Sequence, residues 1–541
     1  MQKETNNQEM TNQAQQISGT AQEVQKVPLD NPESLDINLT TESTQGWNFY
    51  TIRTTDSGNF IDMKIANILK FLEIKGFRRL KMPNGGYELV KIHKNSILIF
   101  SDIADMMETV RKQLIDIDRQ PEVWEEFMER NYLTSQVENA MERIKEIKLN
   151  QATKTHSYFF FENGVVEVTK DKIKMISYEN YHGYIFEDQI IKHPFEIQHF
   201  VNNENAMFDT FLQNVTNNDP KRYDYLTSSL GYLMHTYKDK TLTRAVILVD
   251  EEIDFEGGAE GGTGKTLITE AVSYMVKSAV KDGRALVTGG NRFFYQDIDL
   301  SHRLMIIDDI SSDTHFEKFF SVVTGGMTVE KKGKQSFSIP FELSPKLLIT
   351  SNYMVNGAGG NSEERRKIEV EIAPYYRSKS IKEEFGCTFF GDWDTREWNL
   401  FYNKMITYCQ KFLKHNIMYS EPINLVENKL ISETDFSFVE FMDSNVVFNE
   451  ENTEFKAEKA EFFKAYKDKH PLESKQLTIN MFKKWCGKYA SVRNYDIAHP
   501  KSNSKSYLKI SVKPQSEKEN FKKSNCHSCR SAKVLKISKT D

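Results

Sequence analysis

Hydrophobic and polar positions follow different periods along the chain, and the changes divide it into regions. Residues 1–45 are rich in Gln, Asn, Thr and Glu, and their scattered Val and Leu show neither a helical nor a strand period. A segment of this composition buries too little apolar surface to offset the entropy lost on ordering. We therefore predict that residues 1–45 form a disordered polar tail.

Helical and strand patterns are mixed between residues 46 and 225. The run DMKIANILKFLEIKG has apolar residues at helical spacing, whereas GYELVKIHKNSILIF alternates on both sides of Lys94 and Asn95. A second alternating run, FFFENGVVEV, contains Asn163 and Gly164, a pair typical of a type I′ turn between two strands. The pattern predicts an α+β N-terminal domain over 46–225.

Short apolar runs alternate with helical patterns from residue 226 to residue 415. RAVILVD (244–250), RLMIID (303–308) and KLLITSN (346–352) are such runs, and each ends in polar residues. Runs of this kind are typical of strands buried on both faces of a parallel sheet, whose chemistry lies at the carboxyl ends of the strands. We predict an α/β domain with a parallel sheet over 226–415.

The C-terminal region has a third pattern. AEKAEFFKAYKDKH and TINMFKKWCGKYA are amphipathic helical runs and SKSYLKISVK alternates as a strand, which predicts a small winged-helix-like domain over 420–515. Its second helix would expose Lys483, Lys484 and Lys488 beside Trp485; such a face reads duplex DNA, docks a protein or is purely structural. Residues 516–541 are expected to form a basic tail, because eleven Lys and Arg oppose three Asp and Glu from Lys501 onward.

Composition narrows the class of protein. The 541 residues are 39% hydrophobic and 27% charged, and no apolar run approaches the roughly 20 residues that span a bilayer, so no membrane partner is expected. A net charge of −6 argues against a protein that coats nucleic acid with its whole surface, but it does not exclude a local basic site. Five cysteines without a disulfide spacing and a polar start without a signal peptide predict a cytoplasmic protein.

The segment GGAEGGTGKTL carries the first chemical signal. Against the phosphate-loop pattern Gly-x4-Gly-Lys-Ser/Thr, Ala259 stands at the first position, where the pattern has Gly. Glycines let backbone N–H groups face phosphates, and the following helix adds its amino terminus to the anion site. Lys265 would contact the β and γ phosphates of ATP, and the Thr266 hydroxyl would bind Mg²⁺. The predicted nucleotide-binding residues are Ala259, Glu260, Gly261, Gly262, Thr263, Gly264, Lys265, Thr266 and Leu267.

Polar residues also end the next two predicted strands. Asp308 and Asp309 follow LMII, and we assign Asp308 to Mg²⁺ and Asp309 to polarising the attacking water, although the two roles could be exchanged. Asn352 follows KLLITS, where its amide would lie between the water and the γ phosphate. The three motifs together predict an ATP-hydrolysing site.

These motifs resemble those of superfamily 3 helicases, specifically the phage and plasmid primase-helicase type. GGAEGGTGKT, LMIIDD and KLLITSN occur in this order, and Asn352 lies 87 residues after Lys265. The resemblance is close over residues 240–375 and weaker upstream. It implies an AAA+-like P-loop ATPase fold, ATP and Mg²⁺ as cofactors, and a homo-oligomeric, hexameric ring. It also implies 3′ to 5′ translocation on single-stranded or forked DNA and, for a phage-encoded protein, action in the cytoplasm of the bacterial host.

The resemblance implies two further elements. The first is a hairpin that grips single-stranded DNA, for which GGMTVEKKGKQSFSIPF offers Lys331, Lys332 and Lys334 at its tip. The second is an arginine donated to the γ phosphate of the neighbouring subunit. Arg365 and Arg366 precede a predicted strand, and their spacing to it slightly favours Arg366.

Two other functions are compatible with parts of this pattern. A ring ATPase that loads, packages or remodels DNA complexes without unwinding needs the same catalytic residues, and only the lysine hairpin argues against it. A nonenzymatic DNA-binding adaptor does not need the intact set of Lys265, Thr266, Asp308 and Asn352.

Two candidate metal sites are not expected. Asp116 and Asp118 lie in a helical pattern that points them apart, so we expect a separate primase polypeptide. Cys526 and Cys529 lack two further ligands at suitable spacing for zinc.

Overall fold

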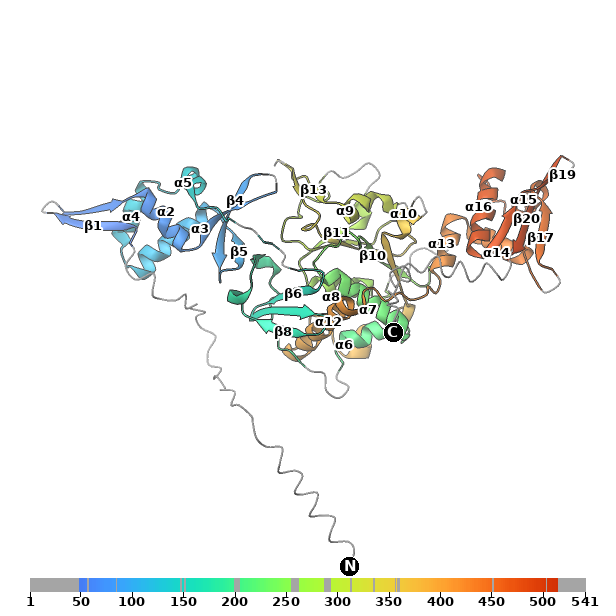
Figure 1. Ribbon diagram of the computed structural model, residues 1–541, viewed down its shortest axis with the longest axis horizontal. Coiled ribbons are helices and arrows are strands. Elements are labelled where there is room, and N and C mark those ends of the chain that lie inside the picture. The colour runs from blue at the N-terminus through green and yellow to red at the C-terminus, as the bar shows by residue number, and fades with distance from the viewer. Residues whose placement is uncertain are drawn as a thin grey trace, which may run out of the picture. The chain divides into compact units, whose positions relative to one another are not determined.

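The computed structural model describes most of the chain between residues 48 and 513 (Figure 1). The described residues exclude 56–57, 84, 146–147, 150–151, 199–204, 254–261, 287–292, 312–313, 334–335, 356, 358–360, 450–451 and 503. The predicted polar tail (1–45), the predicted basic tail (516–541) and the Cys526–Cys529 pair lie outside the described residues. In the described part of the chain, no helix combines the length and the apolar character that crossing a membrane requires.

The chain forms two compact units, residues 1–71 and 72–541. In the first unit, β1 (Tyr50–Thr55) pairs antiparallel with β2 (Gly58–Met63), and the buried ring of Phe49 packs on Phe71. Helix α2 (Ile65–Ile74) begins in the first unit and ends in the second, and Gly76 follows it with a positive φ of 97°.

A four-stranded sheet opens the second unit. Its order is β3 (Phe77–Lys81), β4 (Tyr87–His93), β5 (Ile97–Phe100) and β9 (Ile185–Phe186). The hairpin predicted around Lys94 and Asn95 is confirmed: His93 pairs with Ile97 across a three-residue turn, 94–96, in which Lys94 and Asn95 have positive φ. The helical segments that follow are α3 (Ile103–Arg111), the π-helical turn η1 (Lys112–Ile117), α4 (Pro121–Glu129) and α5 (Ser135–Ala140).

A three-stranded antiparallel sheet consists of β6 (His156–Phe161), β7 (Gly164–Thr169) and β8 (Ile173–Ile176). The predicted turn at Asn163 and Gly164 is wrong by one residue. Phe161 pairs with Gly164, so the two residues of the turn are Glu162 and Asn163. The amide of Asn163 exchanges two hydrogen bonds of 3.0 Å with the backbone of Phe195. This tertiary contact fixes the turn. Short 3-10 turns η2 (Tyr178–Asn180) and η3 (Glu187–Gln189) follow.

The predicted parallel sheet is confirmed. Its order is β11 (Ser278–Asp282), β12 (Leu304–Asp308), β15 (Lys346–Ser351), β10 (Ala245–Asp250) and β16 (Lys367–Ile372), and every neighbouring pair is parallel. Alternate residues of β10 belong to two different hydrophobic clusters, Val246 and Leu248 to one, Ile247 and Val249 to the other. Both faces of the sheet are therefore covered, as the apolar runs predict.

Helices α6 (Met207–Asn214), α7 (Pro220–Met234), α8 (Lys265–Ser273) and α12 (Thr395–His415) contribute to the first of these clusters, and Figure 1 shows α7, α8 and α12 on one side of the sheet. The opposite face packs against η5 (Phe316–Phe319) and α9 (Phe320–Thr324). The remaining elements of this region are β13 (Met327–Val329), β14 (Phe337–Ile339), η4 (Gly283–Ala285), α10 (Asn361–Glu364), η6 (Pro374–Tyr376) and α11 (Ile381–Phe385).

The domain boundary expected at 225/226 is misplaced. Asp219 caps α7 by accepting hydrogen bonds from two backbone N–H groups, Pro220 occupies its first position, and the helix then runs through the boundary without interruption. Phe159 and Val166 of the preceding three-stranded sheet lie in the same hydrophobic cluster as Leu248 of β10. The β6–β8 sheet therefore shares its core with the parallel sheet.

The C-terminal region has its own hydrophobic cluster, which contains Phe438, Tyr466, Phe482 and Ile510. After α13 (Leu425–Glu433), its elements are α14 (Phe436–Asn445), β17 (Glu454–Glu458), α15 (Lys459–Lys469), α16 (Ile479–Val492), β18 (Tyr495–Ala498), β19 (Lys501–Ser502) and β20 (Lys505–Val512). The strands form an antiparallel sheet in the order β17, β20, β18. Both predicted helices and the predicted strand are confirmed.

Candidate nucleotide site

Polar side chains from three neighbouring strands meet at the carboxyl edge of the parallel sheet. β10 ends at Asp250, β12 ends at Asp308, and Asn352 follows the last residue of β15, the strand between them. Strands β10 and β12 lie on the two sides of β15, and the loop after β10 leads into α8. In open parallel sheets, ligands bind outside the carboxyl ends of strands at such a position.

The described end of the phosphate loop has the backbone that its glycines permit. Gly262 and Gly264 have positive φ of 91° and 97°, and Gly264 is the N-cap of α8. A Cβ at Gly264 would lie 2.6 Å from the ring of Phe211, whereas one at Gly262 would meet nothing within 4 Å. Ala259, Glu260 and Gly261 lie outside the described residues. Thr266 is exposed in the first turn of α8, and Leu267 is partly buried against the core.

Lys265 is held by oxygen atoms of the site itself. Its side chain is buried, with 8% of the residue exposed, and Nζ lies 2.5 Å from Asp250 Oδ1 and 2.8 Å from Asn352 Oδ1. Thr263 Oγ1 also donates to Asp250 Oδ1, at 2.6 Å. Burial lowers the pKa of Lys265, and the charge of Asp250 opposes that shift. The positive charge of Lys265 is thus balanced by the carboxylate of Asp250 at the carboxyl edge of the sheet.

Sequence reasoning missed Asp250 as a functional residue. It was assigned to the end of an apolar run, yet it is 2% exposed and is the closest partner of Lys265. A usable signal exists, because Asp250 ends the apolar strand whose connection contains the phosphate loop, and ligands of parallel sheets bind at the carboxyl ends of strands.

The two adjacent aspartates are oriented by one threonine of the neighbouring strand. Thr350 Oγ1 donates to Asp308 Oδ1 at 2.6 Å and accepts from the backbone N–H of Asp309 at 2.8 Å. Asp309 has a positive φ of 53°, so the chain turns sharply between the two carboxylates. Asn352 Nδ2 donates to Asp309 Oδ1 at 3.0 Å. The amide of Asn352 therefore connects Lys265 to Asp309.

Arg284 is a second residue that sequence reasoning missed. It follows the edge strand β11 and its guanidinium forms an ion pair with Asp309. The side chain of Arg284 is 70% exposed and that of Asp309 is 30% exposed. No pattern around Arg284 marks it, because its partner comes from a different strand.

The predicted lysine hairpin is confirmed in its backbone. β13 and β14 pair antiparallel, and Gly333 has a positive φ of 71° at the turn. Lys332 is exposed, whereas Lys331 is partly buried with its Nζ 5.5 Å from the centre of the Phe337 ring. Lys334 lies outside the described residues.

The two arginines before β16 differ in their surroundings. The guanidinium of Arg366 donates to the carbonyl oxygen of Ser362 and, at 2.6 Å, to its hydroxyl, and it lies 4.6 Å from the centre of the Phe320 ring. Arg365 is exposed. The sequence spacing slightly favours Arg366 as the arginine that reaches a neighbouring subunit, but contacts within its own chain occupy this side chain.

Among the described residues, no group of three or more His, Cys, Asp or Glu side chains could hold a metal ion by itself. Asp116 lies in the π-helical turn η1, 3.8 Å from Arg111, and Asp118 follows that turn.

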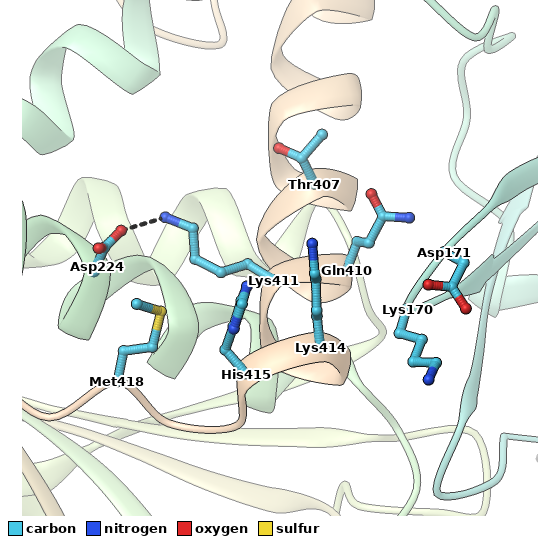
Figure 2. Close-up of a pocket in the computed structure, with 9 residues that line it drawn as sticks. All are labelled: Lys170, Asp171, Asp224, Thr407, Gln410, Lys411, Lys414, His415 and Met418. Carbon is cyan, nitrogen blue, oxygen red and sulfur yellow. Dashed lines mark hydrogen bonds and ion pairs between the residues drawn. The ribbon is translucent and has the colours of Figure 1, made fainter.

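Two cavities deserve comparison with this site. One of about 510 Å³ is lined by Glu251 and Glu252, directly after Asp250, and by Tyr375 and Lys379 after β16. It borders the same edge of the sheet as the side chains described above, which we call the polar cluster: Asp250, Lys265, Asp308, Asp309 and Asn352. The other, of about 520 Å³, lies between α7, α12 and the β7–β8 turn (Figure 2). In it Lys411 points to Asp224 at 2.7 Å, and it shares no residue with the polar cluster.

Among known protein families, one model matches part of the chain. The profile of a family of unknown function (DUF5906) matches residues 257–366, a range that begins in the phosphate loop and ends at Arg366. No curated protein matches the chain.

Three solved structures match the chain at low sequence identity. The apo A form of the NrS-1 C-terminal region is 12% identical, with 82% of this chain and 99% of that chain covered and a TM-score of 0.37. A second structure of that region is 13% identical at the same coverage, with a TM-score of 0.38. Drosophila ORC bound to DNA is 10% identical, with 60% of this chain and 94% of that chain covered and a TM-score of 0.16. At these TM-scores the three structures carry no argument about this chain.

Proposed function

We propose that the protein is an ATP-dependent, Mg²⁺-requiring helicase that acts in phage or mobile-element DNA replication, in the cytoplasm of a bacterial host. One observation carries the proposal. Lys265, at the amino terminus of α8, is joined through Asn352 to Asp309, and all three lie at the carboxyl edge of one parallel sheet. A phosphate-contacting cation, a polar sensor and a carboxylate in one hydrogen-bonded series are the groups that phosphoryl transfer to water requires.

ATP binding would begin with an exchange of partners at Lys265. The β and γ phosphates would replace Asp250 as the counter-charge of the ammonium group, while the amino terminus of α8 adds backbone N–H donors. The cavity lined by Glu251, Tyr375 and Lys379 borders this edge and is large enough for a nucleoside. Asp250 would then keep its bond from Thr263 and hold the end of the loop.

The residues present fit a Mg²⁺ ion that ATP brings with it. Thr266 is exposed at the first turn of α8 and Asp308 ends the neighbouring strand β12, and Mg²⁺ in nucleotide sites takes only one or two protein oxygens beside phosphates and water. The ion would neutralise charge on the phosphates. Asp309 and Asn352 would orient the attacking water, because each already holds the other in place.

Movement on DNA would come from the lysine hairpin, and efficient hydrolysis from a second subunit. Lys331, Lys332 and Lys334 would neutralise phosphates of a single strand, each adding about −0.7 to the slope of log K against log salt. Arg365 is exposed before β16, so we assign to it the contact with the γ phosphate of a neighbouring subunit in a ring, most simply a hexamer. Such arginines raise hydrolysis rates by about 10³–10⁵.

The test is ATP turnover measured alongside strand displacement on a forked duplex. The full chain should hydrolyse ATP faster with single-stranded DNA and displace the strand, and Lys265→Ala should lose both activities. Lys318→Ala is the matched control, because Lys318 is an exposed lysine of the same region outside the polar cluster. DNA-stimulated turnover without displacement would show a ring ATPase that loads, packages or remodels. Turnover that Lys265→Ala leaves unchanged overturns the assignment and leaves a DNA-binding adaptor as the alternative.

The hairpin and the arginine have their own tests. Replacing Lys331, Lys332 and Lys334 by Ala should preserve nucleotide binding but remove DNA stimulation. Mixing Arg365→Ala chains with Lys265→Ala chains should restore part of the hydrolysis at mixed interfaces, which a monomer could not do. The same mixture made with Arg366→Ala in place of Arg365→Ala separates the two arginines.

A further inference from the structure

A cavity of about 410 Å³ lies outside the nucleotide site, between the face of strands β4 and β5 and the helical segment formed by α3 and η1. Lys75, Lys91 and Lys112 line it, together with the apolar side chains of Ile99 and Ile117. We refer to it as the three-lysine pocket. It shares no residue with the nucleotide site or with the lysine hairpin.

Local structure brings the lysines together from distant places in the sequence. Lys91 of β4 stands directly opposite Ile99 of β5, so both side chains project from the same face of the sheet. The other wall contains Lys112, the first residue of η1, where the N–H of Asp118 bonds to the carbonyl of Gln113 at 2.8 Å. Such π-helical turns are rare and occur frequently at functional sites.

The acidic residues of this wall have partners of their own. Glu108 accepts two hydrogen bonds from Arg111, at 2.7 and 2.9 Å, and Asp105 accepts one from the backbone N–H of Asp102 at 2.9 Å. Lys112 lies 3.8 Å from the shared carboxylate of Glu108. The carboxylates therefore stabilise the helix and Arg111, and they compensate the three ammonium groups only in part.

The directions of the lysine pKa shifts agree with an incomplete compensation of the three positive charges. Burial lowers the pKa of Lys75, which the charge of Asp118 opposes. Burial also lowers the pKa of Lys91, and the charges of Lys112 and Lys75 lower it further, against the opposing effect of Asp105. Lys75 and Lys91 are partly buried and Lys112 is exposed, and the cost of holding the two partly buried ammonium groups near a third positive charge would be reduced by an anion between them.

The cavity of Figure 2 differs in this respect, although it also contains several basic side chains. There Lys411 donates to Asp224 at 2.7 Å and to the hydroxyl of Thr227 at 3.0 Å. Lys170 and Lys414 are exposed at its border. The carboxylate of Asp224 lies 2.7 Å from its partly buried lysine, closer than the 3.8 Å between Lys112 and Glu108, so this cavity serves as the comparison.

We propose that the three-lysine pocket binds a phosphate group, carried by a single-stranded nucleic acid or by a free nucleotide. Three ammonium groups from separate elements surround one space, and lysine contacts phosphate as a point charge that needs no fixed geometry. Ile99 and Ile117, the latter 63% exposed, offer apolar surface to the sugar or base attached to the phosphate. The pocket would give the chain a second contact with its polynucleotide or a nucleotide sensor outside the phosphate loop.

The experiment uses the full chain with Asp250→Asn/Lys265→Ala, so that the phosphate loop does not dominate the measurement, no hydrolysis is needed and no carboxylate is left buried without its ammonium partner. Lys91→Met and Lys112→Met are added, since Met keeps the length of the side chain and removes the charge. Two probes are used: a short labelled oligothymidylate in fluorescence anisotropy, and inorganic pyrophosphate in thermal shift at constant ionic strength. The double substitution should weaken binding of one probe about tenfold, and for the oligonucleotide it should reduce the salt slope by about 1.4.

Each outcome is decisive. Loss confined to the oligonucleotide identifies a polynucleotide as the source of the phosphate, and loss confined to pyrophosphate identifies a free nucleotide. Unchanged binding of both probes overturns the proposal, as does an equal loss in Lys170→Met/Lys414→Met. Lys91→Arg/Lys112→Arg should restore binding, and melting temperatures at or above that of the parent chain exclude misfolding. Because the parent already carries Lys265→Ala, failure of the helicase proposal leaves this result unaffected.

Discussion

The candidate nucleotide site and the three-lysine pocket both contain buried or partly buried lysines, but the positive charge of these lysines is balanced differently in the two places. Lys265 has Asp250 at 2.5 Å and the oxygen of Asn352 at 2.8 Å, so its counter-charge is part of the fold. Lys91 instead lies near two further lysines, whose charges lower its pKa. The first arrangement is stable before a ligand arrives, whereas the second requires an anion to reach its lowest free energy.

The largest expected effect is a difference in the free energy of unfolding between variants in which Lys265 or Lys91 is replaced. Lys265→Met should lower the free energy of unfolding by about 3–5 kcal/mol, because it leaves the carboxylate of Asp250 buried without an ammonium partner. Lys91→Met should leave that free energy unchanged or raise it. Denaturant unfolding of both variants provides the measurement, and Asp250→Asn/Lys265→Met should recover part of the loss. Equal destabilisation by the two substitutions would remove the distinction.

The next effect concerns how rigidly each site is held. Thr350→Val removes the hydroxyl that binds both Asp308 and Asp309, and we expect a loss of about 1–3 kcal/mol in stability and at least about tenfold in ATP turnover. Thr109→Val is the matched control in the three-lysine pocket, because that hydroxyl donates only to the carbonyl of Asp105 within its own helix. A turnover rate unaffected by Thr350→Val would show that the aspartates need no such support.

A smaller effect is expected at Arg284. Its ion pair with Asp309 occupies a carboxylate that we assign to the attacking water, so Arg284→Ala should raise the basal rate of ATP hydrolysis. Exposed ion pairs contribute about 0.2–1 kcal/mol, which limits the increase to about fivefold. Lys281→Ala removes an ion pair with Asp297 from the same edge strand and should leave the rate unchanged. A fall in rate would instead place Arg284 among the residues that hydrolysis requires.

The smallest effect is a pH dependence that the three-lysine pocket should show. The pKa of Lys91 lies below its usual value of 10.5 in the folded chain, so the unfolded chain binds the proton more tightly between these two values. The stability advantage of Lys91→Met should therefore be complete at neutral pH and should shrink as pH rises toward 10.5. Thermal melting of both chains across this range gives the measurement. A constant difference would mean that the charge of Lys91 costs nothing.

Local patterns predicted the elements of the nucleotide site but not all of its contacts. The strands that end at Asp250 and Asp308, the helix after the phosphate loop and the lysine hairpin are each encoded by a continuous run of residues. The ion pair of Asp250 joins β10 to α8 and that of Arg284 joins η4 to the residue after β12, and the local patterns that predict these elements do not predict such pairs. The packing of Arg366 on the ring of Phe320 is not predicted by the sequence either, because it joins two separate segments of the chain.

The same limit applies to the rest of the chain. The hairpin at Asn163 was predicted, but its turn moved by one residue because Phe195 binds the asparagine. The domain boundary predicted at 225/226 was wrong, because the composition of the sequence does not show that the buried helix α7 continues across these residues. The lysines of the three-lysine pocket resemble any surface lysines until strand register and the π-helical turn place them together.

The parallel pairing of β9 with β5 determines which fragments of this protein can be prepared. Phe186 of β9 lies in one hydrophobic cluster with Leu98 of β5 and Ile247 of β10. A recombinant chain that starts after residue 102 would expose this apolar surface and would be expected to aggregate, even though it retains every proposed catalytic residue. Limited proteolysis that cuts between β5 and β9 should leave both pieces associated. Fragments for expression should therefore start before β3.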